Sequence, residues 1–221
     1  MNNYSINQYQ DIRLLNIEAE CVEDWDFADA THVRIKLPPK EEIQFDMDKR
    51  GFFRADRMLT PSINLKANKI DYEKMVRASV EESLSYMDDV RRIAYDSFPV
   101  DRRFNVGVRC NPAIAKKVLD AWIDELDSVL ICKIQEEVAG FLALKKRDGN
   151  KQEIHLAALD SKYRAGMAAT SMYATAVLKC KAEGSRILFG NISTTNMSVM
   201  NLFSFLGATF SLPMDVYLKE L

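Results

Sequence analysis

The chain has 221 residues, of which 48% are hydrophobic, and its 30 basic and 32 acidic residues give a formal net charge of -2. This length and composition predict a globular protein with one full-sized core, or one core and a small subdomain. The balanced charge excludes the positive surface of a general nucleic-acid-binding protein, so no nucleic-acid partner is expected.

Cysteine and histidine are too few and too scattered to predict a metal site. The cysteines form no CxxC pair, and these residues are Cys21, Cys110, Cys132, Cys180, His32 and His155. No window approaches the roughly 18 uncharged apolar residues of a membrane helix, and the polar N-terminus lacks a signal-peptide pattern. We therefore expect a cytoplasmic protein with reduced thiols, no metal and no membrane span.

The first third of the chain predicts a strand, a helix and a second strand. The strands are apolar stretches at 32–38 and 52–65, and the charged segment between them suits a short helix. Gly51 stands where a helix end tolerates positive φ, and Pro38-Pro39 breaks the first strand. We predict a small α/β subdomain over residues 1–69.

Two helices are predicted next, at 80–98 and 112–126. The first has an apolar stripe at three- and four-residue spacing, formed by Leu84, Met87, Val90, Ile93, Ala94 and Phe98. The second has Asn111 as its cap, Pro112 in its first turn and Trp122 on its apolar face. Both helices are expected to pack on a sheet.

Strands and helices alternate in the rest of the chain. Strands are predicted at 128–134, 137–146, 153–159, 186–192, 208–211 and 215–220, and helices from near Gly166 to Gly184 and over 196–206, before Gly207. This order predicts a mixed α/β sheet with helices on its faces.

Two segments of this region carry a family resemblance. LDSKYRAGMAATSMY at 159–173 is similar to the pattern V-D-x-x-Y-R-G-x-G-x-G-x-x-L-L, and NMSVMNLFSFLG at 196–207 is similar to N-x-x-A-x-x-x-Y-x-x-x-G. Over residues 70–221 the chain thereby resembles the GNAT superfamily of acyl-CoA N-acyltransferases. The resemblance implies an α/β (α+β) fold with a mixed central sheet flanked by helices, acetyl-CoA as co-substrate, and transfer of the acetyl group to a primary amine.

A second resemblance concerns the acceptor. SFPVDRRF at 97–104 and DAWIDEL at 120–126 are similar to a region of the TDP-fucosamine acetyltransferases, which acylate the amine of a nucleotide-linked sugar. It implies a small-molecule amine acceptor of the amino-sugar nucleotide class, held by Arg102 and Arg103, with Trp122 as a stacking platform. A solvated loop and a core aromatic are the alternative interpretations. A homodimer is a further expected partner arrangement.

The GNAT resemblance assigns pyrophosphate binding to the start of the helix near Gly166, where unpaired N–H groups and the helix dipole favour an anion. The residues concerned are Arg164, Ala165, Gly166, Met167, Ala168, Ala169 and Thr170. Met167 departs from the pattern, because the family usually has a glycine there. The alternative is a helix start that only packs closely on the sheet.

Strand 153–159 is assigned the pantetheine arm by the same resemblance, through Leu156, Ala157 and Ala158. Simple alternation would place Glu153, His155 and Ala157 on one face and Ile154, Leu156 and Ala158 on the other. Glu153 and His155 are candidate bases for the amine proton. A solvated strand end and a packed histidine are the alternatives for these two residues.

The leaving thiolate has no obvious proton donor in the sequence. Phe203 stands where many GNAT relatives have a tyrosine, so the resemblance places it with the cofactor-binding residues, and core packing is the alternative interpretation. Tyr217, Tyr173 or an ordered water are the possible substitutes. Asn196 is assigned either to the cofactor or to helix capping. Because of Met167 and Phe203, the alternative function is a catalytically degenerate acyl-CoA-binding or partner-binding module.

Overall fold

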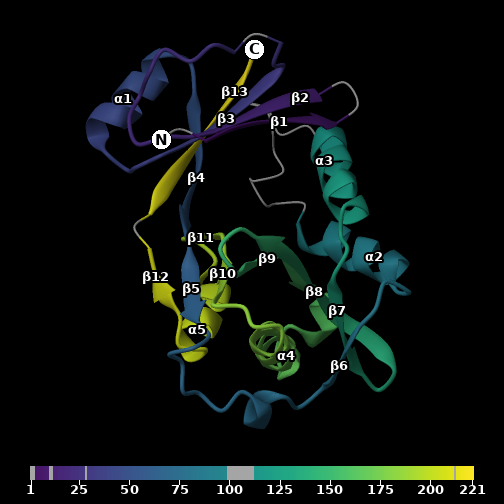
Figure 1. Ribbon diagram of the computed structural model, residues 1–221. Helices are drawn as coiled ribbons and strands as arrows, with labels where there is room; N and C mark the ends of the chain where they lie inside the picture. The colour runs from purple at the N-terminus through teal and green to yellow at the C-terminus, as the bar shows by residue number, and fades with distance from the viewer. Residues whose placement is uncertain (1–2, 10–11, 28, 99–111, 212) are drawn as a thin grey trace.

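The computed structural model describes residues 3–9, 12–27, 29–98, 112–211 and 213–221. Its strands form two sheets that lie one above the other in Figure 1, with both sheets built from both ends of the chain. Among the described elements the chain passes between the sheets four times: from β4 to β5, from β10 to β11, from β11 through α5 to β12, and from β12 to β13.

The upper sheet, called sheet A, has six strands. Their spatial order is β1 (Asn3–Tyr9), β2 (Ile12–Glu18), β3 (His32–Leu37), β13 (Met214–Glu220), β4 (Phe53–Leu59) and β11 (Ile192–Ser193). Strands β2 and β3 are parallel, and the other neighbours are antiparallel. The last strand of the chain therefore lies in the middle of the sheet that the first strands build.

The lower sheet, called sheet B, has seven strands. Their order is β12 (Thr209–Phe210), β5 (Pro61–Asn64), β10 (Ile187–Gly190), β9 (Lys151–Leu159), β8 (Glu137–Arg147), β7 (Val129–Ile134) and β6 (Ser79–Glu82). Only β9 and β10 run parallel within it.

Helices cover the sheets from three sides. They are α1 (Glu41–Lys49), α2 (Met87–Ser97), α3 (Pro112–Asp124), α4 (Ala168–Ala182) and α5 (Met197–Phe205), with short 3-10 turns η1 (Glu73–Met75) and η2 (Ser161–Tyr163). Helix α4 packs on β7 and β8, while α2 packs on β8 and β9, and their apolar contacts form separate cores on the two faces of sheet B. Helix α1 covers one face of sheet A.

The sequence of β3 explains how sheet A is oriented. In HVRIKL, Val33, Ile35 and Leu37 are fully buried in the core shared with α1. Successive side chains of a strand point to opposite faces. Arg34 and Lys36 therefore point away from α1, and this polar face of sheet A looks towards sheet B.

Most predicted elements are confirmed, with shifted ends. The strand at 32–38, the helix before Gly51 and the helix before Gly207 are present, and both glycines have positive φ, +77° and +74°. The prediction for 80–98 is wrong in its first part, because Ser79–Glu82 pairs with β7 as an edge strand and Leu84 is exposed. Strands β1 and β2 were not predicted, since β1 is largely polar.

The mixed sheet flanked by helices is confirmed, but the strands do not divide where a subdomain of residues 1–69 would end. Strand β5 belongs to sheet B, and β13 belongs to sheet A. The division near Lys69 stays a prediction, and any such subdomain exchanges strands with the rest of the chain.

An ion pair connects the last strand to β4. Asp215 on β13 is only 1% exposed, and it accepts hydrogen bonds from Arg57 Nε at 2.6 Å and from Arg57 Nη2 at 2.9 Å. Arg54 lies 3.6 Å from the same carboxylate. Removing the charge of a buried carboxylate that accepts two parallel hydrogen bonds destabilises the fold, because the arginines then face no opposite charge.

We expect Asp215→Asn to lower the free energy of unfolding by about 1–3 kcal/mol, the range for charged hydrogen bonds. Urea denaturation followed by circular dichroism measures it. Asp24→Asn is the matched control, because Asp24 pairs with Arg50 at 3.3 Å but its side chain is fully exposed. Equal effects of the two substitutions would contradict a structural role for the Arg57–Asp215 pair.

Candidate functional site

The site begins where two parallel strands separate. Strands β9 and β10 pair from Lys151 and Ile187 up to Ile154 and Gly190. Beyond this point β9 continues beside β8 alone, whereas the chain after β10 turns into β11 and pairs with β4 in sheet A. In the described chain no strand pairs with this edge of β9 after Ile154, so a wedge opens between the strands.

A cavity of ≈ 630 Å³ fills this wedge, and we call it the splay cavity. Its walls are the second half of β9, the β10–β11 connection, the start of α5, the end of α2 and one side chain of α4. The lining includes Ser97, Phe98, Ile154, His155, Leu156, Ala157, Tyr173, Asn191, Asn196 and Phe203.

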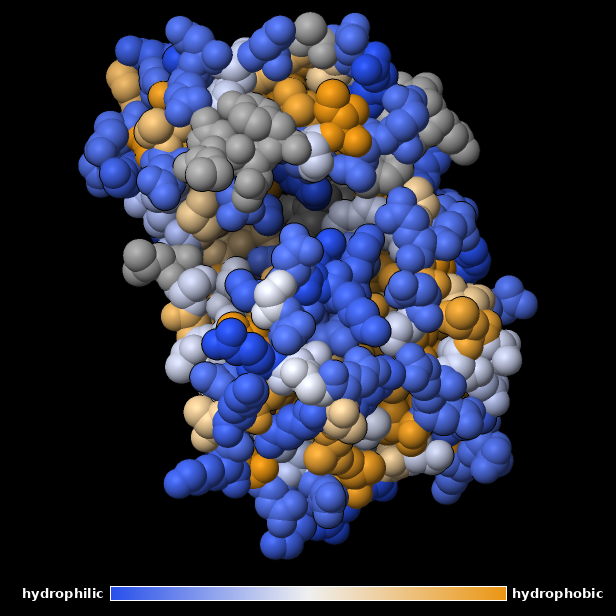
Figure 2. Space-filling view, in the orientation of Figure 1, coloured by the Kyte–Doolittle hydropathy of each residue, from blue (hydrophilic) through white to orange (hydrophobic). Residues whose placement is uncertain are grey.

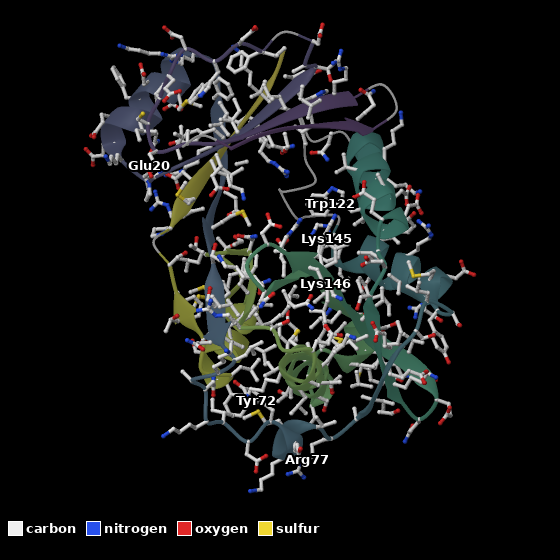
Figure 3. All side chains as sticks on the ribbon, viewed as in Figure 1. Glu20, Tyr72, Arg77, Trp122, Lys145 and Lys146 are labelled. Carbon is white, nitrogen blue, oxygen red and sulfur yellow. The ribbon has the colours of Figure 1, made fainter. Side chains whose placement is uncertain are left out.

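A second cavity of ≈ 400 Å³ lies between the polar face of sheet A and the ends of β8 and β9, and we call it the polar cavity. Figure 2 shows the molecule hollowed between its upper and lower parts, with hydrophilic residues below the hollow. The lining includes Asn7, Asn16, Glu18, Arg34, Lys36, Trp122, Glu125, Lys145, Arg147, Glu153, His155 and Asn191. Trp122 and Lys145 are seen beneath sheet A in Figure 3.

The two cavities adjoin. Ile154, His155 and Asn191 line both of them. His155 is thus the titratable side chain common to both linings in the described structure, and it marks the junction where two bound molecules would meet.

A β-bulge at His155 shapes this junction. Ala143 of β8 is opposite Leu156, and Leu144 is opposite Ile154, so His155 is the additional residue. Such a bulge re-aims side chains. As a result Leu156 and Ala158 pack in the core with α2 and α3, while Ala157 packs on the α4 side with Ile154. The predicted alternation holds up to His155 and is wrong after it.

The surroundings of His155 favour the neutral form of its imidazole. Its ring lies on Trp122, with centroids 4.9 Å apart and planes at 32°. Burial lowers the pKa of His155 below its ordinary value of 6.5, and the charges of Lys145 and Arg147 lower it further. The carboxylates of Glu153 and Glu125 oppose this shift. A neutral imidazole can accept a proton.

Glu153 lies two residues before His155 and faces the polar cavity. It is 9% exposed, ion-paired with Arg147, and accepts a hydrogen bond from Asn191 Nδ2 at 3.1 Å. The solvated strand end considered for this residue is therefore wrong. Its carboxylate is held in place by Arg147 on β8 and by Asn191 in the β10–β11 connection.

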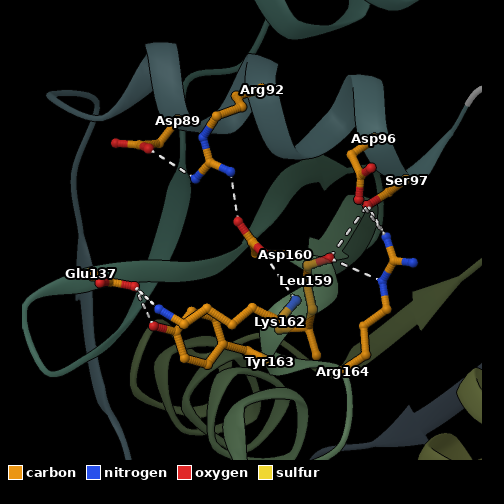
Figure 4. Close-up of polar contacts among 10 residues, drawn as sticks. All are labelled: Asp89, Arg92, Asp96, Ser97, Glu137, Leu159, Asp160, Lys162, Tyr163 and Arg164. Carbon is orange, nitrogen blue, oxygen red and sulfur yellow. Dashed lines mark hydrogen bonds and ion pairs between the residues drawn. The ribbon is translucent and has the colours of Figure 1, made fainter.

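The turn before α4 is tied down by polar contacts, shown in Figure 4. Asp160 accepts from Arg92 at 2.6 Å and from the Lys162 backbone N–H at 3.0 Å. Lys162 and Tyr163 both donate to Glu137, at 2.6 and 2.5 Å. These contacts fix the path of the chain from β9 into α4.

Arg164 leaves this turn towards the end of α2. Its Nη2 lies 3.0 Å from Asp96 Oδ2 and donates to Ser97 Oγ at 3.2 Å, and Ser97 lines the splay cavity. The guanidinium is therefore at the rim of that cavity, engaged by a carboxylate of the protein itself.

Helix α4 begins at Ala168, two residues after the predicted start near Gly166. Met167 is its cap residue and, within the described structure, offers no side-chain hydrogen bond to the first N–H groups. The residue is 52% exposed. A Cβ at Gly166 would meet nothing within 4 Å, so glycine is not sterically required there. Ala165 is exposed as well, whereas Ala168 is in the core.

Phe203 and Asn196 of α5 line the splay cavity, but each also has a structural role. Phe203 is 1% exposed and packs edge-on against Tyr173, with ring centroids 5.5 Å apart. Asn196 caps α5 by accepting from the Val199 N–H at 3.2 Å. The proton donor missing at Phe203 is not replaced by Tyr217, because that side chain is buried in the core between sheet A and α1 and lines neither cavity.

The predicted acceptor residues are placed only in part. Trp122 lines the polar cavity, and its ring lies against that of His155. Arg102 and Arg103 lie outside the described residues. The polar wall on sheet A was missed, including Asn7, Asn16, Arg34 and Lys36. The alternation of charged and apolar residues in HVRIKL was the available signal.

The comparisons with known proteins identify the fold. No protein-family profile and no curated protein matches the sequence. A functionally unknown conserved protein from Staphylococcus epidermidis superposes with a TM-score of 0.66 at 12% identity, covering 94% of this chain and 84% of that one. A GCN5-related N-acetyltransferase from Sphaerobacter thermophilus gives 0.57 at 11% identity, covering 99% and 76%.

A protein assigned to the GNAT family of acetyltransferases, from Novosphingobium aromaticivorans, gives a TM-score of 0.56 at 13% identity, covering 88% of this chain and 76% of that one. The chain has the GNAT fold. Among the described residues, no helix is long and apolar enough to cross a membrane, and no group of three metal-ligating side chains occurs.

The electrostatics of His155 can be tested in the free protein. We expect its pKa, measured by NMR titration of the ring protons, to lie below 6.5. Glu153→Gln should lower it further, and Lys145→Gln should raise it, because the first removes an attractive charge and the second a repulsive one. His32→Gln assigns the other histidine resonance. A pKa that does not respond to either charge would contradict the described geometry.

Proposed function

We propose that this chain transfers an acetyl group from acetyl-CoA to a primary amine, and that the two substrates meet at His155. The observation that carries this proposal is the junction itself. One cavity follows the open edge of β9 and the other is lined by charged groups, and both end at His155 and Asn191. An extended thioester and a polar acceptor would enter from different sides.

Acetyl-CoA would use the splay cavity. The pantetheine arm would lie along β9 at Leu156, Ala157 and Ala158 and pair with their backbone as an added strand does. Its pyrophosphate would reach the N–H groups of Met167, Ala168, Ala169 and Thr170 at the start of α4, where the helix dipole favours an anion. Met167 is 52% exposed at this helix start.

The acceptor amine would enter through the polar cavity. An alkylammonium has a pKa near 10, so it must lose a proton before it attacks. The neutral imidazole of His155 would accept this proton, directly or through water, while Glu153 attracts the cation into place. The amine nitrogen then forms a C–N bond with the thioester carbon, and the C–S bond breaks to release the thiolate of CoA.

The thiolate would be protonated by Tyr173 or by water. Tyr173 lines the splay cavity, whereas Phe203 has no proton to give. Burial raises the pKa of Tyr217, which also makes that residue a poor donor. A thiol of pKa near 8.5 leaves without strong assistance, so the loss of a tyrosine at position 203 is tolerable.

A nucleotide-linked amino sugar remains a predicted acceptor class. The cytoplasmic location and a homodimer also remain predictions. Calorimetry with acetyl-CoA, followed by an assay of free-thiol release over a panel of amines, tests the proposal. Binding with thiol release supports acetyl transfer, and binding without release for any amine would favour the catalytically degenerate binding module.

We expect His155→Gln to reduce kcat/KM by about 10²–10⁴-fold, the contribution typical of general acid–base catalysis. The wild-type pH profile should lose activity below an apparent pKa under 6.5, because protonation of His155 removes the base. Glu42→Gln, at an exposed position on α1, is the control. An unchanged rate in His155→Gln with intact acetyl-CoA binding would remove His155 from the mechanism.

The ion pair between Arg164 and Asp96 gives a prediction in which its two partners have opposite effects on acetyl-CoA binding. Because Asp96 competes for its guanidinium, we expect Asp96→Asn to tighten acetyl-CoA binding about threefold to tenfold, and Arg164→Gln to weaken it by a similar factor. Calorimetry at two salt concentrations measures both, since contacts to phosphates weaken with salt. Weaker binding in Asp96→Asn would show that the ion pair supports the site instead of competing with it.

A further inference from the structure

The wall that sheet A presents to the splay cavity carries a carboxylate that the proposed mechanism does not use. Asp56 of β4 lines this cavity together with Ser193 of β11 and Thr195. Among the lining residues that the structure describes, Asp56 is the only one of the types Asp, Glu, Lys and Arg. A molecule in the splay cavity therefore meets one negative charge on this wall.

Asp56 lies at the border between the two cavities. It stands opposite Val216 of β13, and Met58 follows two residues later on the same face of β4. Val216 and Met58 line the polar cavity, whereas Asp56 lines the splay cavity. Residues opposite each other in neighbouring antiparallel strands have Cβ atoms about 4.5–5.5 Å apart. One molecule can therefore contact Asp56 and also extend into the polar cavity.

The contacts of the Asp56 carboxylate come from neutral donors. Its Oδ1 accepts from Ser193 Oγ at 2.7 Å and from the Arg57 backbone N–H at 2.8 Å. The Arg57 guanidinium is bound to Asp215 on the opposite face of β4. In the described part of the chain Asp56 forms no ion pair. The carboxylate is thus held in place while its charge has no cationic partner in this part of the chain.

Thr195 adds a second acceptor to this wall. The Ser193 hydroxyl proton is donated to Asp56, so the 2.8 Å hydrogen bond between Ser193 Oγ and Thr195 Oγ1 takes its proton from Thr195. A hydroxyl has one proton to donate and two lone pairs, so Thr195 Oγ1 can only accept from a further group. A carboxylate beside such an oxygen complements a group with a positive charge and several N–H donors.

The amine that reacts is a poor partner for Asp56. This amine must lose its proton before it attacks the thioester, and a carboxylate without a cationic partner favours the protonated form. Glu153 differs, because Arg147 already offsets its charge. An ammonium that stays protonated throughout the reaction has no such conflict, and its binding positions the rest of the substrate. Asp56 therefore suits a second cationic group on the acceptor.

We infer that the acceptor is a small diamine, and that Asp56 selects it by binding the ammonium that does not react. The reacting amine would lie at His155, and the carbon chain between the two nitrogens would cross the border between the cavities. This inference rests on the proposed acetyl transfer, and it names the substrate class of the same site. The bond changes are those of that transfer, so the products would be a mono-N-acetylated diamine and CoA as the thiol.

The test compares acceptors that differ only in the second nitrogen. Thiol release would be measured for the α,ω-diamines of three, four and five carbon atoms, and for the amino alcohols in which a hydroxyl replaces one amine. We expect kcat/KM to be at least about tenfold higher for one diamine than for its amino alcohol, as a hydrogen bond to a charged group provides. Equal use of diamines and amino alcohols, or turnover only of amines without a second cation, would overturn the inference but keep acetyl transfer.

Asp56→Asn shows whether this preference comes from sheet A. Asparagine keeps an oxygen that can accept from Ser193 and from the Arg57 N–H. We expect KM for the diamine to rise about tenfold, with kcat nearly unchanged and the amino alcohol unaffected. Asp88→Asn, at an exposed position on α2 that lines neither cavity, is the matched control. A preference that survives in Asp56→Asn, or an equal loss for both kinds of acceptor, would overturn the role of Asp56.

A binding experiment separates this inference from the proposed function. If no amine releases thiol, the same diamines and amino alcohols are titrated calorimetrically into the protein saturated with CoA. Binding of a diamine that is lost in Asp56→Asn but kept in Asp88→Asn would retain the diamine site while acetyl transfer fails. No binding of any diamine, with or without CoA, would overturn the inference.

Discussion

The separation of β9 from β10 is the constraint on which the rest of the structure depends. The two strands are hydrogen-bonded only up to Ile154 and Gly190, because the chain after β10 is needed as an edge strand of sheet A. A polar backbone edge inside a protein must find partners. Because the chain leaves sheet B after β10 to form β11 in sheet A, the edge of β9 beyond Ile154 has no strand beside it in the described structure. Both cavities border on this part of β9.

Much of the fold could be predicted from local patterns, because those patterns have local causes. Alternating residues in HVRIKL define a half-buried strand, and Gly51 and Gly207 end helices in conformations that other residues resist. The failures also have physical reasons. Residues 79–82 form a strand because β7 offers an edge, and the polar β1 is held by its partner β2, neither of which a helical or apolar pattern reveals.

The candidate site was predictable along β9 and α4 but not across the cleft. Glu153 and His155 could be selected because they lie on one predicted strand, which directly precedes the LDSKYRAGMAATSMY segment. The bulge at His155 depends on pairing with β8, so alternation alone placed Ala157 on the wrong face. Arg34 and Lys36 join the site only through the packing of sheet A over sheet B. The alternation in HVRIKL indicates which face of the strand they occupy, but not which element that face meets.

The position of β13 has a consequence for the way the molecule is made. This strand lies between β3 and β4, which precede it by more than a hundred residues, and its pairing with both completes sheet A. Contacts of such long sequence separation form late, since the loop between them must first close. During synthesis the edges of β3 and β4 that pair with β13 therefore stay unpaired until residues 214–220 have left the ribosome. Sheet A, which carries Arg34 and Lys36, is complete only when β13 has paired with both β3 and β4.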